Sequence, residues 1–118
     1  RGSDIDPNAE KMTRRNIARI PGGDELRVKT ADFRDLPPLE NRLSICNPPY
    51  GIRLKKDDDM GAFMREFGDF LKQKCTGSDA LIYVGDPELV KEVGLKAAWK
   101  KPLRNGGLDG RLVKYELY

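Results

Sequence analysis

A short polar motif that follows an apolar run is the part of this sequence best suited to chemistry. The run Leu43–Cys46 leads directly into Asn47, Pro48, Pro49 and Tyr50. The two prolines restrict the backbone and carry no N–H, so the Asn47 amide and the Pro48 carbonyl form a fixed pair of hydrogen-bond acceptors. Such a pair suits a planar amino group, and the aromatic ring beside it suits stacking on a base. The motif predicts a site for the amino group of a nucleic-acid base; the alternative is an ordinary Pro-Pro turn.

The elements around this motif alternate between strands and helices. After a first strand that ends at Asp4, we expect strands at residues 26–30, 43–46, 80–84, 96–103 and 111–118, and helices at 8–19, 60–75 and about 87–93. Alternation of this kind predicts an α/β fold with a parallel sheet, in which the runs 43–46 and 80–84 are buried strands. The last two strands form an antiparallel hairpin, because Asn105, Gly106 and Gly107 make a turn between them. Ligand sites in such sheets lie at the carboxyl ends of strands, which is where the motif stands.

Composition excludes several classes of active site. The chain has 118 residues, which is one domain at most, and no histidine, so histidine-based triads, general bases and zinc sites are excluded. Its 22 Lys and Arg against 19 Asp and Glu give a net charge of +3, too small an excess to indicate nucleic acid alone. The two cysteines are too far apart for a CxxC pair, and we expect a reducing, cytoplasmic setting. No apolar run is long enough to span a membrane.

Three other features have plainer interpretations. Cys46 lies inside an apolar strand and is expected in the core rather than as a nucleophile. The Met and Phe residues of segment 60–75 have helical spacing and are also expected in the core. The acidic run 57–59 stands beside lysines and is expected to be a solvated loop, not a metal site. Basic residues at 53, 55 and 56 either contact RNA phosphates or form a solvated loop.

The motif resembles that of S-adenosylmethionine-dependent amino-methyltransferases, which methylate exocyclic nitrogens. Its flanks are similar to the ribosomal RNA guanine-N2 methyltransferases that carry a THUMP domain and are often labelled N6-adenine-specific DNA methylases. The resemblance covers nearly the whole chain. It is carried by residues 2–7, Asn16, residues 31–33, residues 47–53, residues 101–109 and residues 112–115.

The resemblance implies a Rossmann-like class I methyltransferase fold that binds S-adenosylmethionine. Asp4 would accept hydrogen bonds from the ribose hydroxyls, and Ile5 would pack on the adenine. Asp32 would accept from the adenine amino group, and Phe33 would pack against the ring. The alternatives are that Asp4 caps the following helix together with Asp6, that Ile5 belongs to the core, and that Asp32 makes an Asx-type turn.

On the substrate side, the resemblance implies that Asn47 and the Pro48 carbonyl bind the target amine and that Tyr50 stacks on the target base, with Pro49 as part of the same rigid motif. Neither a metal nor a covalent cysteine is needed. We expect methylation of guanine N2 in ribosomal RNA. Two alternatives stay open: an adenine-N6 DNA methyltransferase, and a non-catalytic α/β module that keeps the motif as a turn.

One departure from the family affects the expected domain. The glycine-rich loop that wraps the methionine part of the cofactor is absent, and neither Gly22-Gly23 nor the turn at 105–107 replaces it. The chain also starts at Arg1 rather than Met. We therefore expect residues 1–118 to be the C-terminal part of a catalytic domain, without the first strand and helix. That strand would lie between the strands ending at Asp4 and Cys46, so its absence leaves sheet edges open to self-association.

Overall fold

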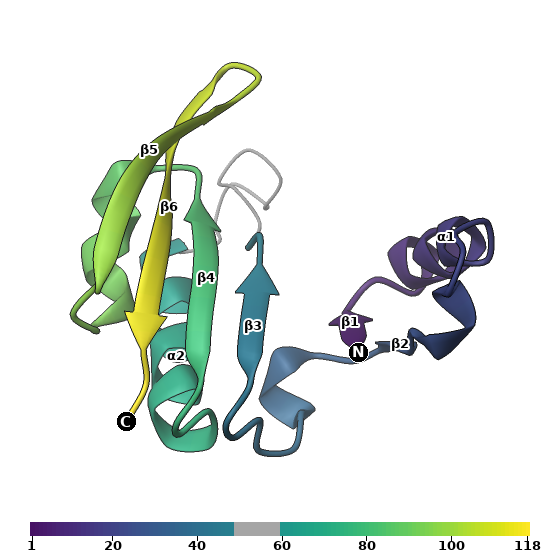
Figure 1. Ribbon diagram of the computed structural model, residues 1–118. Helices are drawn as coiled ribbons and strands as arrows, with labels where there is room; N and C mark the ends of the chain where they lie inside the picture. The colour runs from purple at the N-terminus through teal and green to yellow at the C-terminus, as the bar shows by residue number, and fades with distance from the viewer. Residues whose placement is uncertain (49–59) are drawn as a thin grey trace. The chain divides into compact units, whose positions relative to one another are not determined.

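The chain forms two compact units, residues 1–37 and residues 38–118 (Figure 1). The structure, a computed structural model, describes residues 1–48 and 60–118. Pro49, Tyr50 and the segment 51–59 therefore lie outside the described residues. In the described part of the chain, no helix has the length and apolar character needed to cross a membrane.

The smaller unit is built on two parallel strands joined through a helix. Strand β1 (Gly2–Asp4) pairs with β2 (Val28–Thr30), and helix α1 (Pro7–Ile17) connects them. The helix begins one residue before the expected 8 and ends two residues before the expected 19. Its start is set by the Asp6 side chain, which accepts a hydrogen bond of 2.9 Å from the Asn8 N–H. Two short 3-10 turns, Gly23–Glu25 and Phe33–Asp35, lie on either side of β2.

The smaller unit buries no hydrophobic side chain among its residues. Its two buried residues are Glu10 and Gly23. The Glu10 carboxylate is paired with the Arg14 guanidinium one turn later on α1. The large hydrophobic side chains that are exposed here are those of Ile5, Met12, Ile20 and Leu26. The unit is therefore held by strand pairing, a helix cap and an ion pair rather than by a core.

The larger unit is a four-stranded sheet in the order β3-β4-β6-β5. Strand β3 (Leu43–Cys46) runs parallel to β4 (Asp79–Val84), and β6 (Leu108–Glu116) runs antiparallel to both β4 and β5 (Trp99–Asn105). Helix α2 (Met60–Lys74) lies behind the sheet in the view of Figure 1. The core contains residues of α2, of the sheet and of the 3-10 helix Pro87–Val93: Met64, Leu71, Cys75, Ala80, Ile82, Val84, Val93, Val113, Tyr115 and Leu117.

Helix α2 confirms the prediction that its Met and Phe stripe is core. Met64 and Leu71 are each 1% exposed, and the Phe side chains at 63, 67 and 70 pack against the same cluster. Gly68 lies on this buried face where α2 meets the 3-10 helix. A Cβ atom at Gly68 would lie 1.9 Å from the Val93 carbonyl oxygen, so only glycine allows this close approach.

Strand β3 is less buried than predicted. Leu43 is 63% exposed and Ile45 is 73% exposed, whereas Cys46 packs against the core. The reason is that β3 lies at the edge of the four-stranded sheet and that side chains alternate between its two faces. Only the face that carries Ser44 and Cys46 turns toward the core, so the expectation of a fully buried strand is wrong for Leu43 and Ile45.

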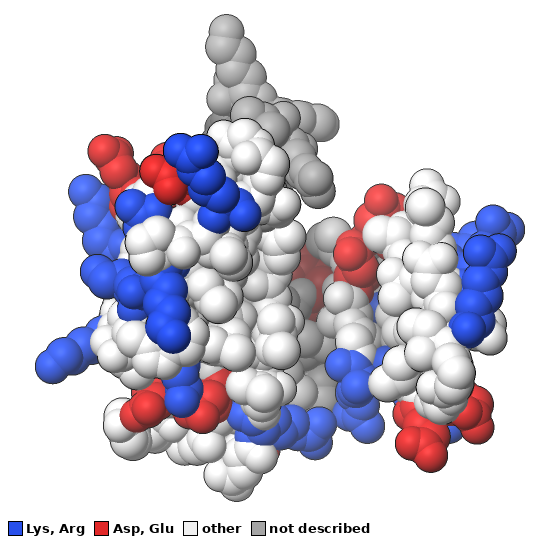
Figure 2. Space-filling model, turned by 45° about the horizontal axis from the view of Figure 1, so that its top comes forward, with Lys and Arg blue, Asp and Glu red and all other residues white. Residues whose placement is uncertain are grey.

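The C-terminal hairpin forms as predicted, but its strands reach further toward the turn. Asn105 pairs with Leu108, so the connection contains two residues, of which Gly106 has a φ of 61°. In Figure 2, Lys and Arg side chains run along the side of the larger unit on which Figure 1 places β5 and β6. The predicted helix at 87–93 is a 3-10 helix, which begins where the Asp86 side chain accepts from the Glu88 N–H at 3.0 Å.

Candidate active site

The smaller unit brings the four predicted cofactor-binding residues to one edge. Asp4 pairs with Thr30 in the parallel register, and the Ala31 N–H donates a 2.9 Å hydrogen bond to the Asp4 carbonyl oxygen. Ile5 follows the end of β1, and Asp32 and Phe33 follow the end of β2. Two carboxylates and two apolar side chains therefore share the carboxyl edge of this strand pair, the edge at which open α/β sheets bind ligands.

The Asp4 carboxylate is oriented by the turn into α1. Its Oδ1 accepts a 2.9 Å hydrogen bond from the Asp6 N–H, while Asp6 itself caps the helix. The alternative that Asp4 caps the helix together with Asp6 is confirmed in part: Asp6 is the N-cap, and the Asp4 carboxylate accepts from the Asp6 N–H in the turn before the helix. The side chains of Asp4 and Ile5 are both exposed, and Ile5 is 65% exposed, so a ligand at this edge can reach them.

Asp32 combines the Asx-type turn with an ion pair that the sequence did not indicate. Its Oδ1 accepts from the Arg34 N–H at 2.9 Å, and its Oδ2 lies 3.1 Å from the Arg34 Nη1. The Arg34 guanidinium also lies over the Phe33 ring, 4.7 Å from the ring centroid. Arg34 thus occupies one face of the aromatic ring that was predicted to pack on adenine. The sequence signal for this ion pair was the position of Arg34 two residues after Asp32.

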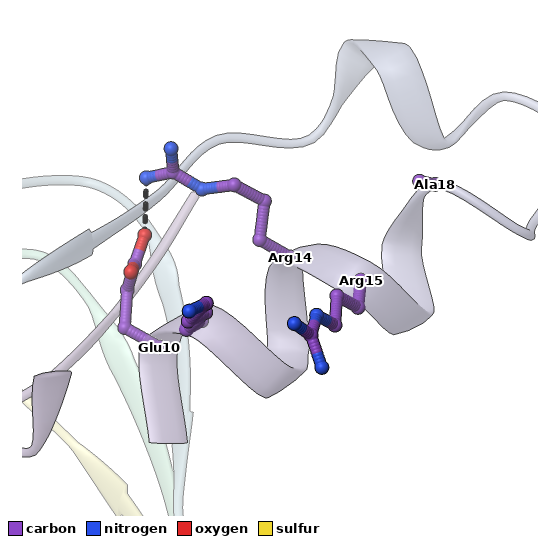
Figure 3. Close-up of a pocket in the computed structure, with 5 residues that line it drawn as sticks. Glu10, Arg14, Arg15 and Ala18 are labelled. Carbon is purple, nitrogen blue, oxygen red and sulfur yellow. Dashed lines mark hydrogen bonds and ion pairs between the residues drawn. The ribbon is translucent and has the colours of Figure 1, made fainter. Parts of the chain in front are cut away.

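A groove on α1 is separate from this edge. It is open, has a volume of about 440 Å³, and is lined by five residues of one helix face (Figure 3): Glu10, Lys11, Arg14, Arg15 and Ala18. The Glu10–Arg14 ion pair spans part of it. None of the predicted cofactor-binding residues lines this groove, and we assign it no role.

The larger unit places Asn47 and Pro48, the described residues of the predicted substrate motif, at the carboxyl end of β3. Cys46, the last residue of the strand, is in register with Ile82 of β4, so Asn47 and Pro48 stand at the edge where β4 also ends. Asn47 is exposed and Pro48 is half-buried. Pro49 and Tyr50, the other two predicted substrate residues, fall outside the described residues. The position of Asn47 matches the predicted one, at the end of a strand.

The structure favours a core role for Cys46. Burial raises the pKa of its thiol to about 12, and burial also raises the pKa of Cys75. Because the thiolate is the reactive form, a raised pKa leaves Cys46 protonated at neutral pH. This is the opposite of what a cysteine nucleophile requires.

Alkylation should show this directly. At pH 8, iodoacetamide should modify the folded chain at least about tenfold more slowly than the chain in urea, because folding raises the pKa of both thiols. The rate for the folded chain should rise as the pH approaches 12. A Cys75→Ser variant isolates Cys46. Equal rates for this variant with and without urea would contradict the buried, protonated thiol.

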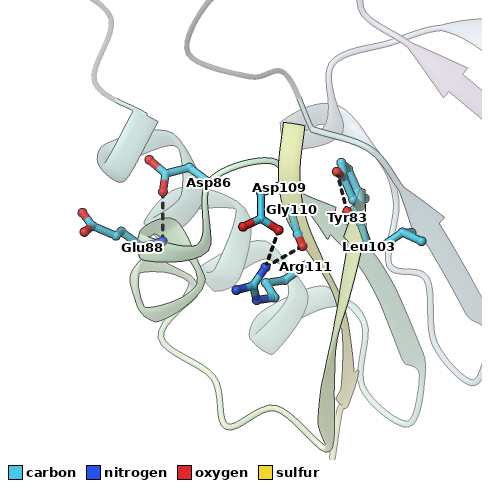
Figure 4. A network of polar contacts seen from close by, with 7 residues as sticks. All are labelled: Tyr83, Asp86, Glu88, Leu103, Asp109, Gly110 and Arg111. Carbon is cyan, nitrogen blue, oxygen red and sulfur yellow. Dashed lines mark hydrogen bonds and ion pairs between the residues drawn. The ribbon is translucent and has the colours of Figure 1, made fainter. Parts of the chain in front are cut away.

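Polar contacts at the end of β4 fix the hairpin beside this edge (Figure 4). The Tyr83 hydroxyl donates a 2.9 Å hydrogen bond to the Leu103 carbonyl oxygen of β5. A Cβ atom at Gly110 would lie 2.4 Å from that hydroxyl, so glycine makes room for the tyrosine. The Arg111 Nη1 donates to the Gly110 carbonyl oxygen at 2.9 Å and lies 3.3 Å from Asp109 Oδ1. The sequence analysis did not identify this network.

Comparison with known proteins shows the family. Residues 1–114 match the family described as RMKL-like, methyltransferase domain (UPF0020). The chain is 36% identical over 118 residues to "Putative RNA methyltransferase slr0064" of Synechocystis sp. This match covers 99% of the chain and 31% of that protein. The chain is 33% identical over 122 residues to "Ribosomal RNA large subunit methyltransferase K/L" of Syntrophotalea carbinolica, covering 98% of the chain and 17% of the relative.

A solved structure confirms the class I methyltransferase fold. The crystal structure of "SMU.472, a putative methyltransferase complexed with SAH" superposes with a TM-score of 0.87 at 26% identity. The match covers 99% of this chain and 31% of that one, so the chain spans less than a third of the length of the proteins it resembles. With 114 of its residues matched to one family, the chain belongs to the RMKL-like methyltransferase domain family.

Proposed function

We propose that this chain serves S-adenosylmethionine-dependent methyl transfer to an exocyclic amino group of a base in RNA, with guanine N2 of ribosomal RNA as the leading target. The observation that carries the proposal is the position of Asn47 and Pro48 at the carboxyl end of β3 in a chain of a methyltransferase family. The relatives named as RNA and ribosomal RNA methyltransferases support RNA as the substrate.

The substrate half of the proposal rests on two acceptors. The Asn47 amide oxygen and the Pro48 carbonyl oxygen each accept one N–H of the target amino group. The lone pair of that nitrogen is ordinarily delocalised into the base, and two acceptors raise the electron density on the nitrogen. S-adenosylmethionine, when bound, supplies an electrophilic methyl group. The residues of the chain contribute positioning and electrostatics rather than a covalent intermediate.

The cofactor half rests on the edge formed by β1 and β2, whose residues fit a nucleoside. The Asp4 carboxylate, held by the Asp6 N–H, would accept from the ribose hydroxyls, and Ile5 would pack on the adenine. Asp32 and Phe33 would contact the amino group and the ring of the adenine. Arg34 lies over one face of Phe33, so the adenine would either stack on the other face or displace the guanidinium. The SAH in the name of the similar crystal structure supports S-adenosylmethionine as the cofactor.

We also propose that residues 1–118 act as the C-terminal part of a longer catalytic domain. The relatives are about three times as long or more, since the chain covers 31% and 17% of their lengths. Leu43 and Ile45 are exposed on the face of β3 that points away from the core, which agrees with a further layer of the longer domain on that face.

Titration calorimetry with S-adenosylhomocysteine tests the cofactor half. We expect binding that Asp4→Asn weakens about tenfold, because this change removes a charged acceptor without changing its shape. Asp69→Asn, an exposed carboxylate on α2, is the matched control and should bind like the original chain. Equal affinity in the Asp4 and Asp69 variants would contradict the assignment of Asp4.

The substrate is tested by offering undermodified ribosomal RNA and duplex DNA to the chain and to a longer protein that contains it. Radiolabelled methyl transfer and mass spectrometry of the digested product identify the modified nucleoside. We expect N2-methylguanosine in the RNA. Transfer to DNA alone would reject the proposal in favour of the adenine-N6 alternative, and transfer to neither would favour the non-catalytic one.

A further inference from the structure

The β5–β6 hairpin extends past the edge at which the substrate motif begins. Val84, the last residue of β4, pairs with Arg111, so residues 108–110 of β6 and their partners on β5 continue beyond the end of β4. Asn47 follows β3, which runs parallel to β4 and ends at the same edge. Figure 1 shows the hairpin extending from this edge of the sheet.

This hairpin is rich in cations that have no acidic partner in the part of the chain that the structure describes. Lys100, Lys101 and Arg104 are exposed, and among the described residues none of the three forms an ion pair. The one acid near the tip, Asp109, is paired with Arg111. The Lys and Arg side chains that run along this side of the larger unit in Figure 2 agree with this excess of positive charge.

Strand register places three of these cations on one face. Lys100 is opposite Val113, the position opposite Arg111 is Pro102, and Arg104 is opposite Asp109. Because opposed residues share a face and faces alternate along a strand, Lys100, Arg104 and Arg111 lie on the same face. Four residues of strand span about 13 Å, a length that several consecutive phosphates of one nucleic-acid strand also cover.

Lys101 lies on the opposite face. Its ammonium is 4.9 Å from the centroid of the Trp99 ring, so a cation–π contact already engages it. The cations available to an anionic ligand are therefore Arg104 near the tip and Lys100 four residues before it on β5. Arg111 lies between them and is held by Asp109 and the Gly110 carbonyl oxygen.

We infer that the β5–β6 hairpin binds the phosphodiester backbone of the RNA strand that carries the target base, through Lys100 and Arg104. This inference rests on the proposed function and extends it from the reacting amine to the surface that holds the strand. Charge complementarity points to a polyanion, and the position of the hairpin at the edge where the motif begins points to the substrate itself. Contacts to phosphates position a nucleic acid without reading its sequence.

The test is the salt dependence of binding to a fluorescein-labelled single-stranded RNA of mixed sequence, measured by anisotropy. Each phosphate contact contributes about 0.7 to the slope of log K against log[NaCl] between about 50 and 200 mM. The double variant K100Q/R104Q should therefore reduce the magnitude of the slope by about 1.4. A charge-conserving double variant of the original chain, K100R/R104K, should have the same slope as the original chain.

A matched control separates local contacts from net charge. K72Q/K91Q removes the same charge from exposed positions on α2 and the 3-10 helix and should leave the slope unchanged. Equal slopes for K100Q/R104Q and the original chain would overturn the inference, as would tighter hairpin-dependent binding to duplex DNA than to RNA. Methyl transfer to the RNA is measured separately. If K100Q/R104Q methylates RNA at the original rate and its salt slope is unchanged, the inference that the hairpin binds RNA is refuted, whereas the proposed function stands.

Discussion

Replacing Asn47 with alanine is expected to lower the rate of methyl transfer by about 100-fold or more, the usual cost of deleting one preorganised polar group at a reacting centre. The change removes one of two acceptors for the target amine and leaves the Pro48 carbonyl oxygen in place. The measurement is the single-turnover rate of methyl transfer to RNA by the active protein that carries these residues. Affinity for S-adenosylhomocysteine should stay unchanged, because Asn47 is assigned to the substrate and not to the cofactor.

The matched control for this change is Gln73→Ala, which deletes a side-chain amide from an exposed position of α2. It should transfer methyl groups at the original rate. If Asn47→Ala is as active as Gln73→Ala, the motif is only a turn, and the non-catalytic alternative becomes the better explanation.

The second large effect is expected on stability, from Gly68→Ala. The added Cβ would lie 1.9 Å from the Val93 carbonyl oxygen and 2.8 Å from its carbonyl carbon, and these are backbone atoms that cannot rotate away. Alanine favours a helix over glycine by about 1 kcal/mol, but overpacking of this kind costs more. We expect the free energy of unfolding of the larger unit to fall by about 2 kcal/mol.

Urea unfolding followed by tryptophan fluorescence measures this effect. Trp99 is the one tryptophan of the chain and lies on β5, so its signal reports the larger unit. Gly107→Ala is the control, because a Cβ at Gly107 would meet no atom within 4 Å. If Gly68→Ala unfolds at the same urea concentration as Gly107→Ala, the 3-10 helix can move away from α2, and the close approach is not a requirement of the fold.

Sequence reasoning succeeded where structure is decided locally. The N-cap of α1 at Asp6, the turn at Gly106 and the order of strands and helices depend on residue types within a few positions of each other. The same holds for the position of Asn47 directly after a strand. These features were therefore predictable from one sequence.

It failed where burial depends on distant partners. The apolar run at 43–46 indicates a strand, but the run alone cannot show that β3 forms an edge or that Leu43 and Ile45 face away from the core. The contact of Arg34 with Asp32 and Phe33 is local, and it was missed for a different reason: a long flexible side chain can reach several neighbours. The hydrogen bond of Tyr83 to β5 depends on strand register, which the sequence does not fix.

The lack of buried hydrophobic side chains in residues 1–37 has a consequence for ligand binding. Units of fewer than about 40 residues seldom fold without added support, and the strand pair that presents Asp4 and Asp32 has no core beneath it. A nucleoside that bridges the ends of β1 and β2 would then act as a folding ligand. Its apparent dissociation constant would then be the intrinsic one divided by the fraction of chains in which the strands are already paired, so the apparent affinity would be lower. Amide hydrogen exchange in residues 1–37 should slow when S-adenosylhomocysteine is added, while exchange in the four-stranded sheet should not change.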